Sequence, residues 1–131
     1  MAVDKNMNIL VVDDYQTMRR IIENLLKQLG FHNIDQAADG SSALDLLRNS
    51  EKQYGLIISD WNMDPMTGLQ LCKEVRADAQ LKAVPFIMVT AESKAENVVA
   101  AKQAGVNNYI IKPFNAETLK TKMAAVLGDF A

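Results

Sequence analysis

The sequence has 131 residues, a formal net charge of −2 and 49% hydrophobic residues, which is the size and composition of one globular domain rather than a disordered chain. This charge balance argues against a nucleic-acid-binding surface, and no apolar stretch approaches the ~20 residues that span a bilayer. The single cysteine excludes an internal disulfide, so we expect a protein of the reducing cytoplasm.

Five short apolar runs predict five β-strands along the chain. They cover residues 9–12, 34–38, 56–58, 86–89 and 109–111. Four of the runs are nearly continuous and rich in β-branched residues, which is typical of strands buried on both faces of a parallel sheet. The run 34–38 alternates with polar residues and therefore fits an edge strand.

Apolar residues at helical spacing follow each run and predict five helices, around residues 18–29, 43–47, 69–75, 95–101 and 119–127. Gly30, Gly105 and Gly128 stand where the first, fourth and fifth helices should end. This alternation predicts an α/β fold, a parallel sheet covered by helices on both sides. No long linker interrupts it, so we expect one domain over residues 1–131 with no attached DNA-binding domain.

Polar residues stand at the carboxyl ends of four of the five predicted strands. Asp13 and Asp14 follow the first strand, Asp60 closes the third, Thr90 the fourth and Lys112 the fifth. In open α/β sheets, ligands bind outside the carboxyl ends of the strands. We therefore expect three carboxylates, a hydroxyl and an ammonium to share one crevice.

Three carboxylates in one crevice require a compensating cation. Two of them ~5 Å apart repel each other by roughly 3 kcal/mol at an effective dielectric constant near 20. The ligands are hard oxygens without a histidine or thiolate, which favours Mg²⁺ or Mn²⁺ over zinc. Asp14 taken alone fits the cap of the following helix equally well, but polar residues at four strand ends favour a site.

Four motifs in order resemble the receiver domain of bacterial two-component response regulators. They are Val11-Val-Asp-Asp14, Ser59-Asp-Trp-Asn62, Val89-Thr-Ala-Glu92 and Ile111-Lys-Pro-Phe114, and the resemblance covers almost the whole chain. Trp61, Asn62, the helix 96–105 and Tyr109 extend it to the stand-alone chemotaxis regulators. The resemblance implies a doubly wound, flavodoxin-like (βα)5 fold with strand order 2-1-3-4-5.

The resemblance also implies a phosphorylation chemistry. Asp60 would accept a phosphoryl group from a histidine kinase. Asp14 would bind Mg²⁺ directly and Asp13 largely through water, and Asp60 and the backbone carbonyl of Asn62 would complete the protein ligands. Such a chain is a signalling protein, which catalyses its own phosphorylation and dephosphorylation but is not otherwise an enzyme. Thr90 would contact the phosphoryl oxygens.

The remaining roles follow from the same resemblance. Lys112 would also contact the phosphoryl oxygens, and its peptide bond to Pro113 would be cis. Asn62 and Glu92 would tune the lifetime of the acyl phosphate.

The resemblance also implies a separate surface through which phosphorylation alters the binding of a partner protein. Tyr109, Val98 and Lys122 would belong to a face that changes on phosphorylation and binds a flagellar motor switch protein. A phosphatase would be a further partner, and the chain would act as a monomer without nucleic acid or membrane.

Several residues carry simpler expectations. We expect His32 to be exposed, Cys72 to face the core, and Arg19 and Arg20 to lie on a solvated helix face, with kinase docking as the alternative role for the two arginines. The loop Met63-Asp-Pro-Met-Thr-Gly68 departs from the Met-Pro-x-Met-x-Gly pattern of the family, because its proline stands one place later.

Three alternatives compete with the chemotaxis interpretation. A magnesium-dependent phosphohydrolase would carry Asp-x-Asp after its first strand, whereas this chain has adjacent aspartates and no cap segment. A flavodoxin-like FMN carrier would need a Ser/Thr/Gly-rich loop after Val12, where the two aspartates would repel a phosphate. A single-domain receiver that acts as a phosphate sink or phosphorelay intermediate would share every motif described above.

Overall fold

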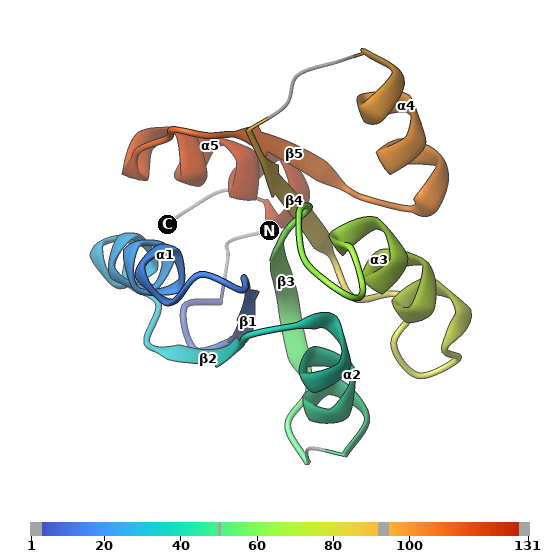
Figure 1. Cartoon of the computed structure of the whole chain (residues 1–131). Helices are drawn as coiled ribbons and strands as arrows, with labels where there is room; N and C mark the ends of the chain where they lie inside the picture. Colours follow the sequence, from blue (N-terminus) through green and yellow to red (C-terminus); the bar gives the residue numbers. More distant parts are fainter. Residues whose placement is uncertain (1–3, 50, 92–94, 129–131) are drawn as a thin grey trace.

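The computed structural model describes residues 4–49, 51–91 and 95–128. Strands and helices alternate five times, as the apolar periodicity predicts (Figure 1). The elements in chain order are β1 (Asn8–Val12), α1 (Gln16–Gln28), β2 (Asn33–Ala37), α2 (Gly40–Asn49), β3 (Tyr54–Asp60), α3 (Gly68–Ala77), β4 (Phe86–Thr90), α4 (Ala95–Ala104), β5 (Asn108–Ile111) and α5 (Ala116–Leu127).

The five strands form one sheet in which every neighbouring pair is parallel. The strand order is β2-β1-β3-β4-β5, which confirms the order implied by the family resemblance. The chain moves outward from β1 to β2 and then crosses back to β3 on the other side of β1. The crevice where ligands bind in such sheets therefore lies at the carboxyl ends of β1 and β3.

Two hydrophobic cores lie on opposite faces of the sheet. In Figure 1, α1 and α5 cover one face, whereas α2, α3 and α4 cover the other. The first core packs Ile22 of α1 and Leu119 of α5 against the strands. The second packs Leu44 of α2, Leu71 of α3 and Ala101 of α4 against the opposite face. Burial on both faces explains why the central strands read as continuous apolar runs.

The predicted helix ends are confirmed by the backbone. Gly30, Gly105 and Gly128 have φ values of 102°, 100° and 107°. Side chains with a Cβ rarely adopt this left-handed region, so glycine ends these helices without strain.

Predicted boundaries differ from the observed ones where polar residues belong to an element. Strand β3 begins at Tyr54, before the apolar run, and it includes Asp60. Helix α2 begins at Gly40, earlier than predicted. The prediction missed its first turn because that turn is polar and carries no apolar periodicity. His32 is exposed and Cys72 is buried, as expected. Within the described residues, no helix combines the length and apolar character that a bilayer crossing requires.

Candidate functional site

Three carboxylates converge at the carboxyl edge of the sheet, as the positions of the strands predict. Asp13, Asp14 and Asp60 each offer an oxygen, and these oxygens all lie within 4.8 Å of one another. Asp13 and Asp60 are buried, with 1% and 5% of their surface exposed, whereas Asp14 is exposed. Tyr15, not Asp14, is the N-cap of α1. The capping interpretation of Asp14 is therefore wrong.

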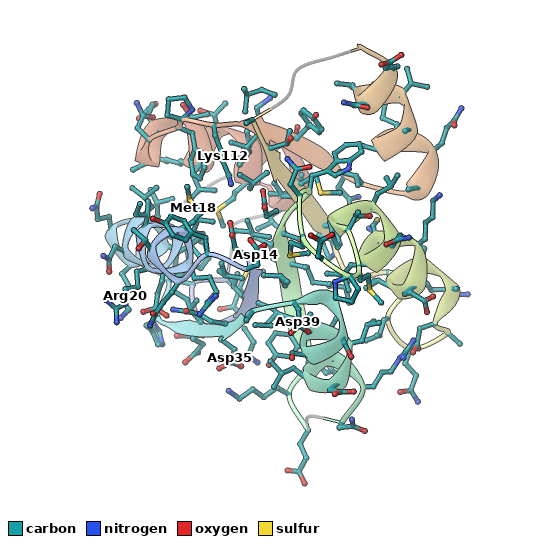
Figure 2. All side chains as sticks on the ribbon, in the orientation of Figure 1. Asp14, Met18, Arg20, Asp35, Asp39 and Lys112 are labelled. Atoms are coloured by element: carbon teal, nitrogen blue, oxygen red, sulfur yellow. The ribbon has the colours of Figure 1, made fainter. Side chains whose placement is uncertain are left out.

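One ammonium faces this acidic triad. The Nζ atom of Lys112 donates a hydrogen bond of 3.0 Å to Oδ1 of Asp60 and lies 3.7 Å from Oδ2 of Asp13. Figure 2 shows Asp14 and Lys112 reaching the same central region from the loops that follow β1 and β5. Lys112 supplies one positive charge to a group of three carboxylates, so these four side chains together keep an excess of negative charge.

Burial makes two of these carboxylates costly to ionise. It raises the pKa of Asp13 to about 6, and the negative charge of Asp60 adds to the shift, whereas the backbone N–H of Tyr15 opposes it. Burial also raises the pKa of Asp60, which the hydrogen bond from Lys112 opposes. Ionising Asp13 and Asp60 therefore destabilises the metal-free folded chain relative to the unfolded chain.

The two oxygens of Asp13 have different surroundings. Oδ1 accepts a hydrogen bond of 2.9 Å from the backbone N–H of Tyr15. Oδ2 is buried and accepts no hydrogen bond from any residue that the structure describes. A buried oxygen without a donor, in a group of carboxylates that contains no histidine or cysteine, fits a hard divalent cation. The acidic triad is thus capable of binding a metal ion.

The ends of β4 and β5 are tied to each other beside the triad. Thr90 is the last residue of β4 and is buried, with 1% of its surface exposed. Its carbonyl accepts a hydrogen bond of 2.7 Å from the backbone N–H of Lys112. The peptide bond between Lys112 and Pro113 is cis, as the resemblance implies.

The loop after Asp60 returns to the strand end through backbone hydrogen bonds. The carbonyl of Trp61 accepts hydrogen bonds from the N–H groups of Met63, at 3.1 Å, and Gly68, at 2.9 Å. Asn62 is exposed in this loop. The shifted proline of the loop, Pro65, follows a second cis peptide bond, which the sequence did not predict.

A capping box fixes the far end of this loop at the start of α3. The side chain of Thr67 accepts a hydrogen bond from the N–H of Gln70, and the side chain of Gln70 accepts one from the N–H of Thr67. Glu92, the other residue expected to tune the phosphate lifetime, lies outside the described residues.

The three expected output residues lie together around one groove. Val98 of α4, Tyr109 of β5 and Lys122 of α5 line a groove of about 380 Å³. Tyr109 is half-buried, and its ring meets that of Trp61 edge to face, with centroids 6.3 Å apart. The sequence did not predict this contact, which joins the residue after Asp60 to the groove.

The expectation for Arg19 is wrong, whereas Arg20 is exposed as expected. Arg19 is half-buried and donates hydrogen bonds to the carbonyl of Asp13, at 2.8 Å, and to Oε1 of Gln36, at 3.1 Å. Consecutive helical residues point about 100° apart. Arg19 therefore turns toward β2 while its neighbour faces solvent, and nothing in the sequence distinguishes the two arginines.

Comparisons with known proteins agree with this geometry. Residues 9–124 match the family described as the response regulator receiver domain. The chemotaxis protein CheY-3 of Vibrio cholerae is 51% identical over 121 residues, which cover 92% of each chain. The chemotaxis protein CheY of Pseudomonas aeruginosa is 50% identical over 120 residues, which cover 92% of this chain and 95% of that protein.

A solved structure supports the same assignment. The crystal structure of the chemotaxis protein CheY4 of Vibrio cholerae superposes with a TM-score of 0.85 at 35% sequence identity, covering 93% of this chain and 99% of that one. The family match spans most of the chain and includes all three residues of the acidic triad. The chain therefore belongs to the response regulator receiver domain family, and within it the chain is a signalling protein of the CheY-like chemotaxis type.

Proposed function

We propose that this chain is a cytoplasmic phosphorylation switch, in which Asp60 accepts a phosphoryl group from a phosphohistidine of a partner kinase. The proposal rests mainly on the groups that surround Asp60. This buried carboxylate lies 3.0 Å from the ammonium of Lys112 and within 4.8 Å of Asp13 and Asp14. A nucleophilic carboxylate, a cation for phosphoryl oxygens and ligands for a metal thus lie together at the carboxyl edge of the sheet.

We assign the metal to Mg²⁺. Asp14 and Asp60 would bind it directly, Asp13 largely through water, and the carbonyl of Asn62 would be a backbone ligand. When bound, Mg²⁺ would neutralise negative charge on the phosphoryl oxygens during transfer. The buried Oδ2 of Asp13, which lacks a hydrogen-bond donor, supports this assignment. Hard oxygen ligands and substrate phosphate oxygens are the partners that Mg²⁺ prefers.

The bonds that form and break in the transfer belong to Asp60 and the phosphodonor. A carboxylate oxygen of Asp60 forms a bond to phosphorus while the bond from phosphorus to the histidine nitrogen breaks, and the imidazole leaves with the electron pair. The Lys112 ammonium holds Asp60 as a carboxylate before transfer and can bind a phosphoryl oxygen afterwards. Water later cleaves the acyl phosphate and restores Asp60, with a lifetime that Asn62 and Glu92 would tune.

The output would be a change of the groove around Tyr109. Phosphorylation adds about −1.5 to −2 charges and new acceptor oxygens, and the hydroxyl of Thr90 would donate to one of them. A ligand shifts an equilibrium only through contacts that differ between two states, and this hydrogen bond is such a contact. Val98 and Lys122, which line the groove with Tyr109, would then contact a flagellar motor switch protein.

Phosphoryl transfer from acetyl phosphate tests the acceptor directly. We expect mass spectrometry to detect one added phosphoryl group on the wild type in Mg²⁺, none in EDTA, and none on Asp60→Asn. Asp45→Asn removes an exposed carboxylate from α2 and should label like the wild type. Labelling of Asp60→Asn at the wild-type rate would place the acceptor elsewhere.

Binding to a peptide from a flagellar motor switch protein tests the output. We expect the labelled chain to bind the peptide more tightly than the unlabelled chain, and Lys122→Ala to reduce this difference without affecting labelling. Normal labelling without any change in peptide binding would instead favour a phosphate sink or phosphorelay intermediate.

A further inference from the structure

Arg19 makes a direct connection between α1 and the backbone of the acidic loop. Its Nη1 atom donates a hydrogen bond of 2.8 Å to the carbonyl oxygen of Asp13, and its Nε atom donates one of 3.1 Å to Oε1 of Gln36. Gln36 lies in β2, so the guanidinium joins a helix, an edge strand and the loop that carries Asp13 and Asp14.

The guanidinium of Arg19 is itself held in place by its neighbours. The side-chain amide of Gln36 donates a hydrogen bond of 3.0 Å to Oε1 of Glu23, one turn further along α1. Glu23 also forms an ion pair of 3.2 Å with Lys27. Gln36 therefore accepts from one residue of α1 and donates to another, which fixes its amide and thereby the direction of Arg19.

Three hydrogen bonds together determine the orientation of Asp13. Its N–H donates to the carbonyl of Ala37 at 3.1 Å, its carbonyl accepts from Arg19, and its Oδ1 accepts from the N–H of Tyr15. Of the two carboxylate oxygens, only Oδ2 is left without a donor among the described residues, and it lies 3.7 Å from Nζ of Lys112. Backbone N–H groups donate two of these three bonds, and the side chain of Arg19 donates the third.

We propose that Arg19 is a positioning residue for the metal site. By holding the carbonyl of Asp13, it fixes the direction of Oδ2 and so raises the affinity of the triad for a divalent cation. This inference rests on the proposed binding of Mg²⁺ at the triad. Partners that orient metal ligands typically contribute a factor of about 10 to 100 in metal affinity. We expect about tenfold, because Arg19 contacts the backbone of Asp13 and not its carboxylate.

The charge of Arg19 taken alone predicts the opposite result. A positive charge close to the triad repels a cation, so removing it would tighten Mg²⁺ binding. Positioning predicts instead that Arg19→Ala weakens binding. The sign of the change therefore separates the two effects, and Arg20→Ala removes the same charge from the exposed side of α1, away from Asp14 (Figure 2).

Titration with MgCl₂ measures the effect without using phosphorylation. Trp61 is the only tryptophan and directly follows Asp60, so its fluorescence reports on the site, with calorimetry as a second readout. We expect the dissociation constant to rise about tenfold in Arg19→Ala and less in Gln36→Ala. Arg19→Lys keeps the charge and one donor to Asp13, so it should recover part of the affinity.

The controls separate this inference from the function on which it rests. Thermal unfolding in EDTA shows whether each variant is folded. If Arg19→Ala is not folded, the Mg²⁺ affinities of Gln36→Ala and Arg19→Lys test the positioning role instead. Arg20→Ala should bind Mg²⁺ as tightly as the wild type or more tightly. Unchanged or tighter binding by Arg19→Ala, or equal weakening in Arg20→Ala, would overturn the positioning role. A wild type that does not bind Mg²⁺ would instead refute the proposed function.

Discussion

Replacing Asp13 by asparagine should stabilise the metal-free protein. Burial raises the pKa of this carboxylate from its ordinary value of 3.8 to about 6, so at neutral pH the fold holds a charge that the unfolded chain holds more easily. Asparagine removes the charge but keeps an Oδ1 oxygen that can accept the 2.9 Å hydrogen bond from the N–H of Tyr15. The bond between Lys112 and Asp60 is also kept.

The magnitude follows from the linkage between protonation and folding. Below pH 3.8 Asp13 is protonated in both the folded and the unfolded chain, so its ionisation has no effect on stability. As the pH rises from there to about 6, the unfolded chain ionises first, and the free energy of unfolding falls. At about 1.36 kcal/mol per pKa unit, the full loss is about 3 kcal/mol and persists above that range.

Urea unfolding in EDTA, followed by circular dichroism, measures this difference. At pH 8 we expect the unfolding free energy of Asp13→Asn to exceed that of the wild type by about 3 kcal/mol, and the gap to close towards pH 4. Asp14→Asn removes an exposed carboxylate and should give a smaller gain. Equal or lower stability of Asp13→Asn at pH 8 would refute the burial penalty assigned to this carboxylate.

Further measurements test other parts of the site. Lys112→Ala should lower the unfolding free energy in EDTA by about 1–3 kcal/mol, because Asp60 stays buried without its donor. Gly68→Ala should cost about 1–3 kcal/mol in the same assay, because a Cβ there would overlap the carbonyl of Asp60. Mg²⁺ affinity should fall below pH 6, where Asp13 protonates. Cys72 should resist thiol reagents until urea unfolds the chain, because burial raises its thiol pKa.

The sequence could predict that the polar residues at the strand ends lie close together, because this depends only on the path of the backbone. Parallel strands place their carboxyl ends along one edge, and the apolar runs locate those ends to within a residue or two. Asp13, Asp60, Thr90 and Lys112 therefore had to approach one another in any sheet with β1, β3, β4 and β5 adjacent. Periodicity does not determine that adjacency, however, and the strand order came from the family resemblance.

Features that depend on contacts between side chains could not be predicted in the same way. Arg19 and Arg20 have equal charge and equal helix propensity, and only the packing of α1 against β2 buries the first of them. The edge-to-face contact of Trp61 with Tyr109 joins β5 to the loop after β3, and no periodic signal reports such a pair. The cis bond before Pro65 also depends on the folded loop.

Stability and metal affinity together distinguish the two kinds of residue around the triad. A carboxylate that binds the cation also repels its neighbours, so its removal should raise the stability of the metal-free protein while abolishing the affinity. A positioning residue such as Arg19 donates hydrogen bonds in the metal-free fold as well, so its removal should lower both quantities. Asp13→Asn and Arg19→Ala should therefore shift metal-free stability in opposite directions while both weaken Mg²⁺ binding. No single effect on overall folding produces that combination.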